Sequence, residues 1–315
     1  MSCSRTSLVV TLRSELTRIL RARSTAWLLP GVCAVSALLA RLSTQIDVSM
    51  ASYGSDANEA LTQALGRGFD PTLDSLWGLA VGVAGMMTFG ALAASSGYSD
   101  EVMVTRPTAA PRAGTLQAAR AIAVAMIAGV VGQVASFAAF WHGQVGISGY
   151  GVSASLAQPG VLRAVTGGGL FLALGAILGF GLGALQHAVV PARSVWLPLA
   201  ATLVVWAGLI AVPDAMSAGQ PDQIVRWLPG AAGTQIWYTK APAFLAPWTG
   251  LGVFCGYAAI AVVAGLIASA GRVRGRRSRG GPVSGTRRGR GRYGADQDVG
   301  GDVGAAGHDD DCLTQ

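Results

Sequence analysis

Charged residues are scarce in this sequence. Of 315 residues only 12% are Asp, Glu, Lys or Arg, whereas 51% are hydrophobic and the mean hydropathy is +0.47. A soluble domain carries about 25% charged residues, so this composition excludes an ordinary soluble enzyme. The few charges are clustered and leave long uncharged windows. Because a helix needs about 20 apolar residues to cross a bilayer core, the sequence predicts an all-α membrane protein.

The sequence also lacks the motifs of nucleotide and metal chemistry. It has no Gly-x-x-x-x-Gly-Lys-Ser/Thr loop, which excludes a phosphate-binding loop of the P-loop type. Its three histidines, at positions 142, 187 and 308, have no ligand spacing to one another or to a cysteine pair. Its four cysteines, at positions 3, 33, 255 and 312, form no disulfide pattern. We therefore expect no catalytic residue, no cofactor-binding residue and no metal ligand in this chain.

Acidic residues are absent from the middle of every apolar window. Carriers driven by protons or sodium ions usually depend on an intramembrane carboxylate. The energy for any transport is therefore expected to come from outside the chain.

Six windows are long enough to be considered membrane spans. We expect them at about 25–42, 75–96, 118–141, 164–186, 194–213 and 248–270. The glycine- and serine-rich stretch 143–160 is interpreted as an external loop. Glycines are dense in the second and fourth windows, which predicts close helix packing and a candidate dimer face.

Residues 272–315, first Arg/Gly-rich and then acidic, are predicted to be a disordered tail. An Arg-Gly tract can bind nucleic acid, but beside membrane spans we expect lipid contact and no nucleic acid.

The first 24 residues are predicted to form an interfacial amphipathic helix. Its apolar residues recur at helical spacing, and the other side carries Arg13, Glu15, Arg18 and Arg21. Such a helix lies in the headgroup plane, with its arginines on anionic lipid. A charged leader before a signal peptide is the alternative, but residues 39–42 (LARL) make a poor cleavage site.

The distribution of basic residues predicts the orientation. With the N-terminus inside, the inner segments before the tail carry nine Arg or Lys residues and the outer segments carry five. Positively charged segments stay in the cytoplasm. An even number of spans then places both termini on the cytoplasmic side of the membrane.

One enzyme motif has to be weighed against this interpretation. Gly146-Ile147-Ser148-Gly149 is similar to the serine motif of rhomboid-type intramembrane proteases, which pair the serine with a histidine on another span. His187 falls at the opposite, inner end of its window, and a nucleophile and its base must lie within hydrogen-bond reach. An intramembrane hydrolase is therefore the least favoured alternative.

The polar connector 97–120 carries the clearest resemblance. It ends in Pro111-Arg112-x-Gly114-x-Leu116-x-Ala118-Ala119-Arg120. With the basic N-terminal pattern of residues 12–29, this resembles the membrane (permease) subunits of type 2 ATP-binding-cassette exporters of high-GC actinobacteria. Further similar stretches are Ala135-Ser136-Phe137, residues 159–164, Leu228-Pro229 with Ala232-Gly233, and residues 247–251. The chain departs from the family pattern at Gly97 and at Glu101-Val102.

The resemblance implies a transport subunit and not an enzyme. ATP and Mg²⁺ would be bound by a separate cytoplasmic ATPase, and a second permease subunit, identical or related, would complete the pathway as a homodimer or heterodimer. The ATPase would be contacted by the N-terminal helix and by the connector residues Tyr98, Asp100, Glu101, Arg106, Pro111, Arg112 and Arg120. Residues 214–247 would form an outer, partly re-entrant segment, with Trp227, Trp237, Tyr238 and Trp248 at the membrane interface.

A carrier or channel that needs no ATPase is the main alternative. The uncharged spans are compatible with lipophilic or amphiphilic cargo.

Overall fold

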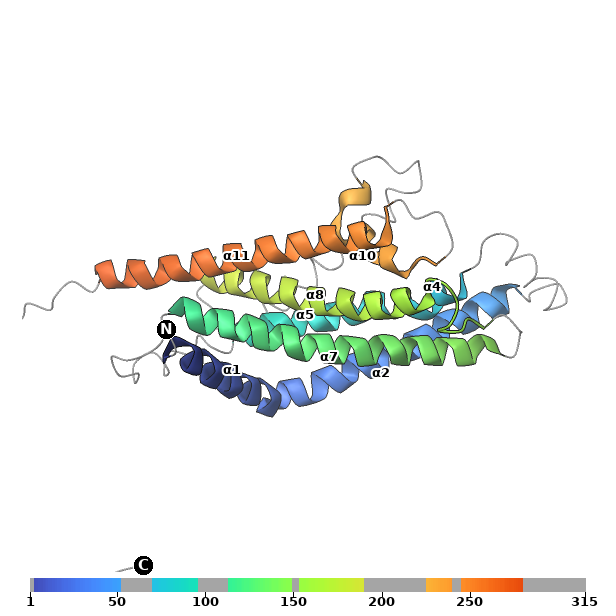
Figure 1. Cartoon of the computed structure of the whole chain (residues 1–315), viewed down its shortest axis with the longest axis horizontal. Coiled ribbons are helices and arrows are strands. Elements are labelled where there is room, and N and C mark those ends of the chain that lie inside the picture. The colour runs from blue at the N-terminus through green and yellow to red at the C-terminus, as the bar shows by residue number, and fades with distance from the viewer. Residues whose placement is uncertain are drawn as a thin grey trace, which may run out of the picture.

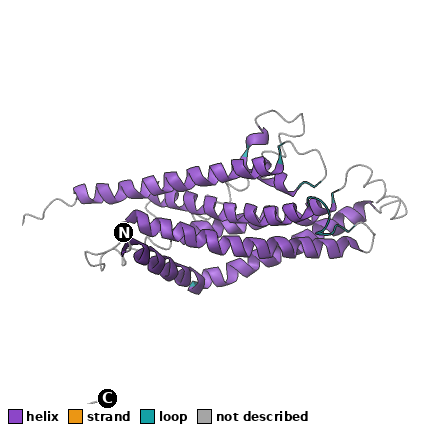
Figure 2. Ribbon diagram, viewed as in Figure 1, coloured by secondary structure: helices purple, strands orange, loops and turns teal. Residues whose placement is uncertain are grey.

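A computed structural model describes residues 3–51, 70–95, 113–148, 153–189, 225–239 and 245–279. Within these ranges helices are the only regular secondary structure, with short loops and turns beside them, as Figure 2 shows. The helices are α1 (Cys3–Arg21), α2 (Arg23–Ala51), α4 (Pro71–Leu76), α5 (Leu79–Ser95), α7 (Ala113–Ile147), α8 (Val161–Val189), η2 (Val225–Trp227), α10 (Pro229–Thr234), η3 (Gln235–Trp237) and α11 (Pro247–Arg279).

Five helical segments are long and apolar enough to cross a membrane. They are Arg23–Ile46, Pro71–Ser95, Leu116–Ile147, Val161–Gln186 and Pro247–Ser269. Each overlaps one of the windows predicted from the sequence, so the helical character of these windows is confirmed, and their length and composition are those of membrane spans. The sixth predicted span, at 194–213, lies outside the described residues.

Some helix boundaries differ from the predicted ones. Helix α7 continues to Ile147, so the prediction of a loop from residue 143 was wrong for its first residues. The reason is packing: Gly143 lies against the side chain of Ser75, and Gly146 lies against Thr44. These contacts extend α7 through glycines, which have low helix propensity. Helix α11 also runs to Arg279, past the predicted start of the tail at residue 272.

The helices lie side by side along the long axis of the molecule (Figure 1). Helices α5 and α8 run parallel, since Leu79 packs at Gly168 and Ala91 packs at Gly183. Helix α7 runs antiparallel to α8: Gln133 donates to the carbonyl of Thr166 at 3.0 Å, and Ser136 donates to that of Val165 at 2.6 Å. Helix α2 covers α5 and α7 on one side, and α11 covers α8 on the other.

Glycines permit the closest helix contacts, as predicted. A Cβ atom at Gly90 of α5 would collide with the carbonyl oxygen of Ala176 in α8. A Cβ atom at Gly179 of α8 would collide with the carbonyl oxygen of Met87 in α5. The two backbones are therefore in direct contact, which only glycine allows.

Helices α8 and α11 also run parallel to one another. The Phe171 and Phe254 rings stack with centroids 4.9 Å apart, and farther along both helices Gly181 packs against Ala261. Helix α8 therefore ends at the end of the bundle that holds α1, whereas η2 and α10 lie toward the opposite end (Figure 1). The chain between Val189 and Val225 begins at one end of the bundle and finishes at the other.

Candidate functional site

Helix α1 forms an elbow with α2 at one end of the bundle and packs on α7. Ile19 is buried, and Leu12 and Leu16 pack against the hydrophobic core. Val9 and Val10 face away, with 63% and 67% of their surface exposed. Helix α1 is therefore attached to the bundle by one apolar stripe, while other apolar residues remain at its surface.

A buried ion pair joins α1 to α7. Arg120 Nε donates to Glu15 Oε2 at 3.0 Å, and its Nη2 donates to Oε1 at 3.5 Å. Only 3% of Arg120 and 4% of Glu15 is exposed. Two charges this far from water are tolerated because each neutralises the other, and removing one would leave the second uncompensated. The pair therefore holds the N-terminal helix against the first turns of α7.

Arg18 extends this ion pair toward the surface. Its Nη1 lies 3.7 Å from Glu15 Oε2, and 41% of its side chain is exposed. Since an exposed ion pair stabilises a protein by about 1 kcal/mol or less, the Arg18–Glu15 contact adds little to the attachment of α1 to α7.

The structure places the sequence-predicted site residues in three groups. Glu15 and Arg120, which come from the two predicted elements, are brought together and buried. Arg13, Arg18 and Arg21 remain at the surface of α1. The connector residues Tyr98, Asp100, Glu101, Arg106, Pro111 and Arg112 lie outside the described residues.

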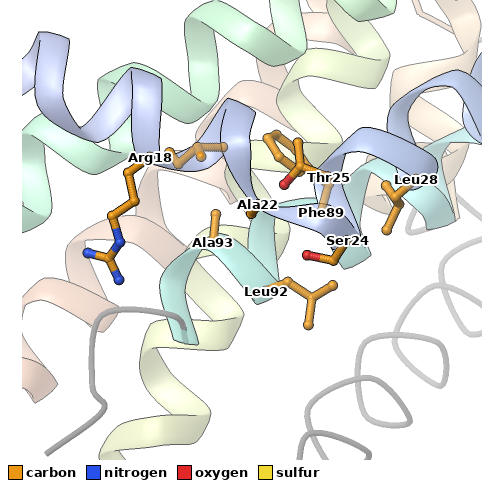
Figure 3. A pocket seen from close by; sticks show the side chains of 9 residues that line it. Arg18, Ala22, Ser24, Thr25, Leu28, Phe89, Leu92 and Ala93 are labelled. Carbon is orange, nitrogen blue, oxygen red and sulfur yellow. The ribbon is translucent and has the colours of Figure 1, made fainter. Parts of the chain in front are cut away.

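A small pocket lies between the α1–α2 elbow and the last turns of α5. It measures about 80 Å³ and is lined by Arg18, Ile19, Ala22, Ser24, Thr25, Leu28, Phe89, Leu92 and Ala93. Figure 3 shows Arg18 on one side of it and Ser24 and Leu28 on the other, with Leu92 and Ala93 from α5 between them. The pocket thus combines one cation and two hydroxyl groups with an apolar wall.

A second polar cluster closes the opposite end of the bundle. Asp70 caps α4 by accepting hydrogen bonds from the amides of Thr72 and Leu73. Its carboxylate also accepts from the amide of Thr239 at 2.8 Å and from the Thr239 hydroxyl at 2.7 Å. Arg163 donates to the carbonyl of Tyr238 at 2.6 Å. Sequence reasoning missed this cluster, although Asp70 before Pro71 is a typical helix-start signal.

The predicted outer segment is partly buried. Trp237 is 1% exposed, and its ring packs edge-on against Phe171, with centroids 5.2 Å apart. The interpretation of Trp237 as an interfacial aromatic was therefore wrong, because η3 directs the indole into the bundle against α8. Trp227 and Trp248 are exposed, by 45% and 57%, as an interfacial position requires.

The structure also bears on the hydrolase alternative. Ser148 directly follows α7 and donates to the carbonyl of Val145 at 3.1 Å. His187 lies near the end of α8, which runs antiparallel to α7. The helix directions therefore place positions 148 and 187 toward opposite ends of the bundle, an arrangement that does not favour a nucleophile–base pair. Among the described residues, no cluster of His, Cys, Asp and Glu side chains is arranged to hold a metal ion.

Comparison with protein-family models gives no match, and comparison with curated protein sequences gives no significant match either.

Proposed function

We propose that the chain is the permease subunit of an ATP-binding-cassette exporter, and that a separate ATPase drives it. In this proposal the α1 end of the bundle faces the cytoplasm of a bacterial cell and both termini lie there. Two permease subunits form the pathway, and ATP and Mg²⁺ are bound only by the partner ATPase. The proposal rests on the resemblance of the connector and the N-terminal helix, together with the geometry at that end of the bundle.

The Glu15–Arg120 pair is the observation that carries the proposal. Arg120 lies in α7 just after the connector, and Glu15 lies in the middle of α1. Because their 3.0 Å contact is buried, a force applied to the connector reaches α1 and α7 together. When a bound nucleotide closes an ATPase, such an ion pair between α1 and α7 would be needed to move the spans as rigid bodies.

The course of the chain supports six spans. The described parts of α8 and α11 run parallel, and the chain between them changes from one end of the bundle to the other. A further span at 194–213 would make that crossing. It would also leave the end of α11 on the same side as α1, which agrees with the predicted position of both termini.

The test is capture of the ATPase from native membranes. We expect an affinity-tagged chain to co-purify a protein that is photolabelled by 8-azido-ATP, because the chain itself has no P-loop. Reversing two connector charges, with Glu101→Arg and Arg112→Glu, should abolish the labelled band. Arg41→Glu, an exposed substitution in α2 outside the connector, is the matched control and should leave the band intact.

Two outcomes would overturn the proposal. The docking role is wrong if the double charge reversal retains the labelled partner. If the purified chain alone moves an amphiphilic dye across liposomes without any ATPase, the carrier or channel alternative replaces the exporter.

A further inference from the structure

We propose that the acidic segment 296–311 of this chain binds to the basic end of helix α11. The basic end is defined as residues 272–279, where α11 finishes. The acidic segment lies outside the described residues and is the occupant that this end of the helix fits best. The inference does not depend on an ATPase partner or on the side of the membrane that the end of α11 faces.

Helix α11 continues well beyond its apolar part. The candidate span ends at Ser269, whereas the helix continues to Arg279. Figure 1 shows this end of α11 projecting past the ends of α7 and α8. Because each residue adds 1.5 Å of rise, the helix gains about 15 Å beyond the span. The backbone of the basic end therefore extends away from the helical bundle.

The basic end would be a poor helix on its own. It contains five arginines, at positions 272, 274, 276, 277 and 279. Several of them are three or four residues apart, which makes like charges neighbours on a helix and destabilises it. Gly271 and Gly275 lower the helix propensity further. The negative end of the helix dipole offsets only part of this repulsion. A helix through this stretch therefore calls for an anionic partner.

The membrane surface reaches only the first part of the basic end. Headgroups add about 5–8 Å to each side of the hydrocarbon core. For a helix that stands upright in the bilayer, positions 276–279 lie about 10–15 Å past the end of the candidate span. Anionic lipid would therefore neutralise the charge at position 272, whereas the outer positions favour a partner in the water phase.

The same chain carries a matching negative charge. Residues 293–315 contain no Arg or Lys but six aspartates, at positions 296, 298, 302, 309, 310 and 311. Only residues 280–295 separate them from the basic end. A linker of this length spans up to about 55 Å when extended, whereas the basic end is about 10 Å long. The acidic segment therefore reaches every position of the basic end.

The covalent connection makes a weak contact sufficient. Each exposed ion pair contributes little, but a short linker raises the local concentration of the acidic segment to about the millimolar range. Several weak pairs then hold the segment in place. The contact should be sensitive to salt, because ions screen exposed charges that lie more than about 10 Å apart at 0.1 M. While the acidic segment is bound, other polyanions are excluded from the basic end.

The linker contains competing arginines, at positions 287, 288, 290 and 292. They lie closer in sequence to the aspartates than the basic end does. The basic end differs because the helix already fixes the backbone of its five arginines. Binding to it therefore orders less of the chain than pairing with the linker arginines would.

The experiment uses the purified full-length chain in phosphatidylcholine nanodiscs. Cys3, Cys33 and Cys255 are replaced by serine, and spin labels are attached to Cys312, directly after the acidic segment, and to Ile267→Cys, at an exposed position of α11. Pulsed electron–electron double resonance measures the distance between the labels. We expect a narrow population at short distance in low salt, and a broad distribution at about 0.5 M NaCl, where the charges are screened.

Charge variants identify the two partners. Replacing all six aspartates by asparagine keeps their size, and should abolish the short-distance population and raise amide exchange of residues 272–279 by about tenfold. This variant changes no residue of the bundle, so it tests the inference even if the next one folds poorly. Replacing the five arginines of the basic end by glutamine should also abolish the population. The matched control replaces the four linker arginines by glutamine and should leave it intact.

The inference is wrong if the asparagine variant retains the short distance, since charge would then not hold the segment. A loss in the linker variant as large as that in the basic-end variant would show that the aspartates pair with the linker. If phosphatidylglycerol nanodiscs abolish the short distance, the membrane surface binds the basic end instead. Disappearance of the short distance on dilution with unlabelled chain would assign the contact to the acidic segment of a second copy.

Discussion

Glu15 and Arg120 stand 105 residues apart in the sequence and are in direct contact in the structure, 3.0 Å from carboxylate oxygen to guanidinium nitrogen. Both residues are more than nine-tenths buried. The contact is a salt bridge between two helices, α1 and α7. It determines how the N-terminal helix is attached to the bundle, and it can be tested directly.

A double-mutant cycle tests this ion pair. We expect Glu15→Gln or Arg120→Met alone to destabilise the protein by about 3–5 kcal/mol, because each leaves the partner charge buried and uncompensated. The double variant should be more stable than the sum of the two losses predicts. The measurement is thermal unfolding in detergent, followed by tryptophan fluorescence. Strictly additive losses would contradict a direct interaction between the two side chains.

The helix-packing glycines give a second prediction. Gly90→Ala and Gly179→Ala each place a methyl group against a carbonyl oxygen of the neighbouring helix. We expect each to cost about 1–3 kcal/mol, since overpacking forces the two backbones apart. Gly129→Ala is the matched control, because a Cβ there meets nothing within 4 Å. That variant should be neutral or stabilising, since alanine favours the helix. Equal effects at all three positions would show that α5 and α8 are not in backbone contact.

Within the described residues, the sequence predicted the long apolar helices well and the contacts between them poorly. A window of about 20 apolar residues identifies a helix such as α5 or α8 whatever its neighbours are, and the glycine clusters indicated close packing. The Glu15–Arg120 and Asp70–Thr239 contacts depend on the tertiary arrangement. Periodicity along one helix shows which residues share a face, but it does not show which distant side chain that face meets.

Helix boundaries failed for a related reason. Gly143 and Gly146 indicate a loop when only local propensity is considered. In the structure they let α7 approach Ser75 of α4 and Thr44 of α2, so the helix continues through them. Trp237 was misjudged in the same way, because its position against Phe171 depends on how η3 sits on α8.

The contact between Asp70 and Thr239 gives a third prediction. Asp70 accepts hydrogen bonds from both the amide and the hydroxyl of Thr239. We expect Asp70→Ala to cost the helix cap, about 1 kcal/mol, and to release residues 235–239 from α4. Amide hydrogen exchange of that segment should increase, because its bond to the carboxylate is lost.

A milder variant separates the two roles of Asp70. Thr239→Val removes only the hydroxyl bond and keeps the amide bond, so it should raise exchange in the same segment by a smaller amount. Thr234→Val is its control, since the Thr234 hydroxyl bonds only within its own helix, to the carbonyls of Gly230 and Ala231. If Asp70→Ala left exchange at Thr239 unchanged, the carboxylate would not hold this segment in solution.

Orientation in the membrane gives the last prediction. The proposed topology places the connector on the cytoplasmic side and the segment between α7 and α8 outside. In a variant whose four cysteines are replaced by serine, a single cysteine at Val104 should resist a membrane-impermeant maleimide added to intact cells. A single cysteine at Gln158, which is exposed between α7 and α8, should react. Permeabilised cells provide the control, because both positions should then be modified. Labelling of Val104→Cys from outside would invert the orientation, since the arginine-rich segments would then lie on the side where they are rarely found, and the connector could not meet a cytoplasmic ATPase.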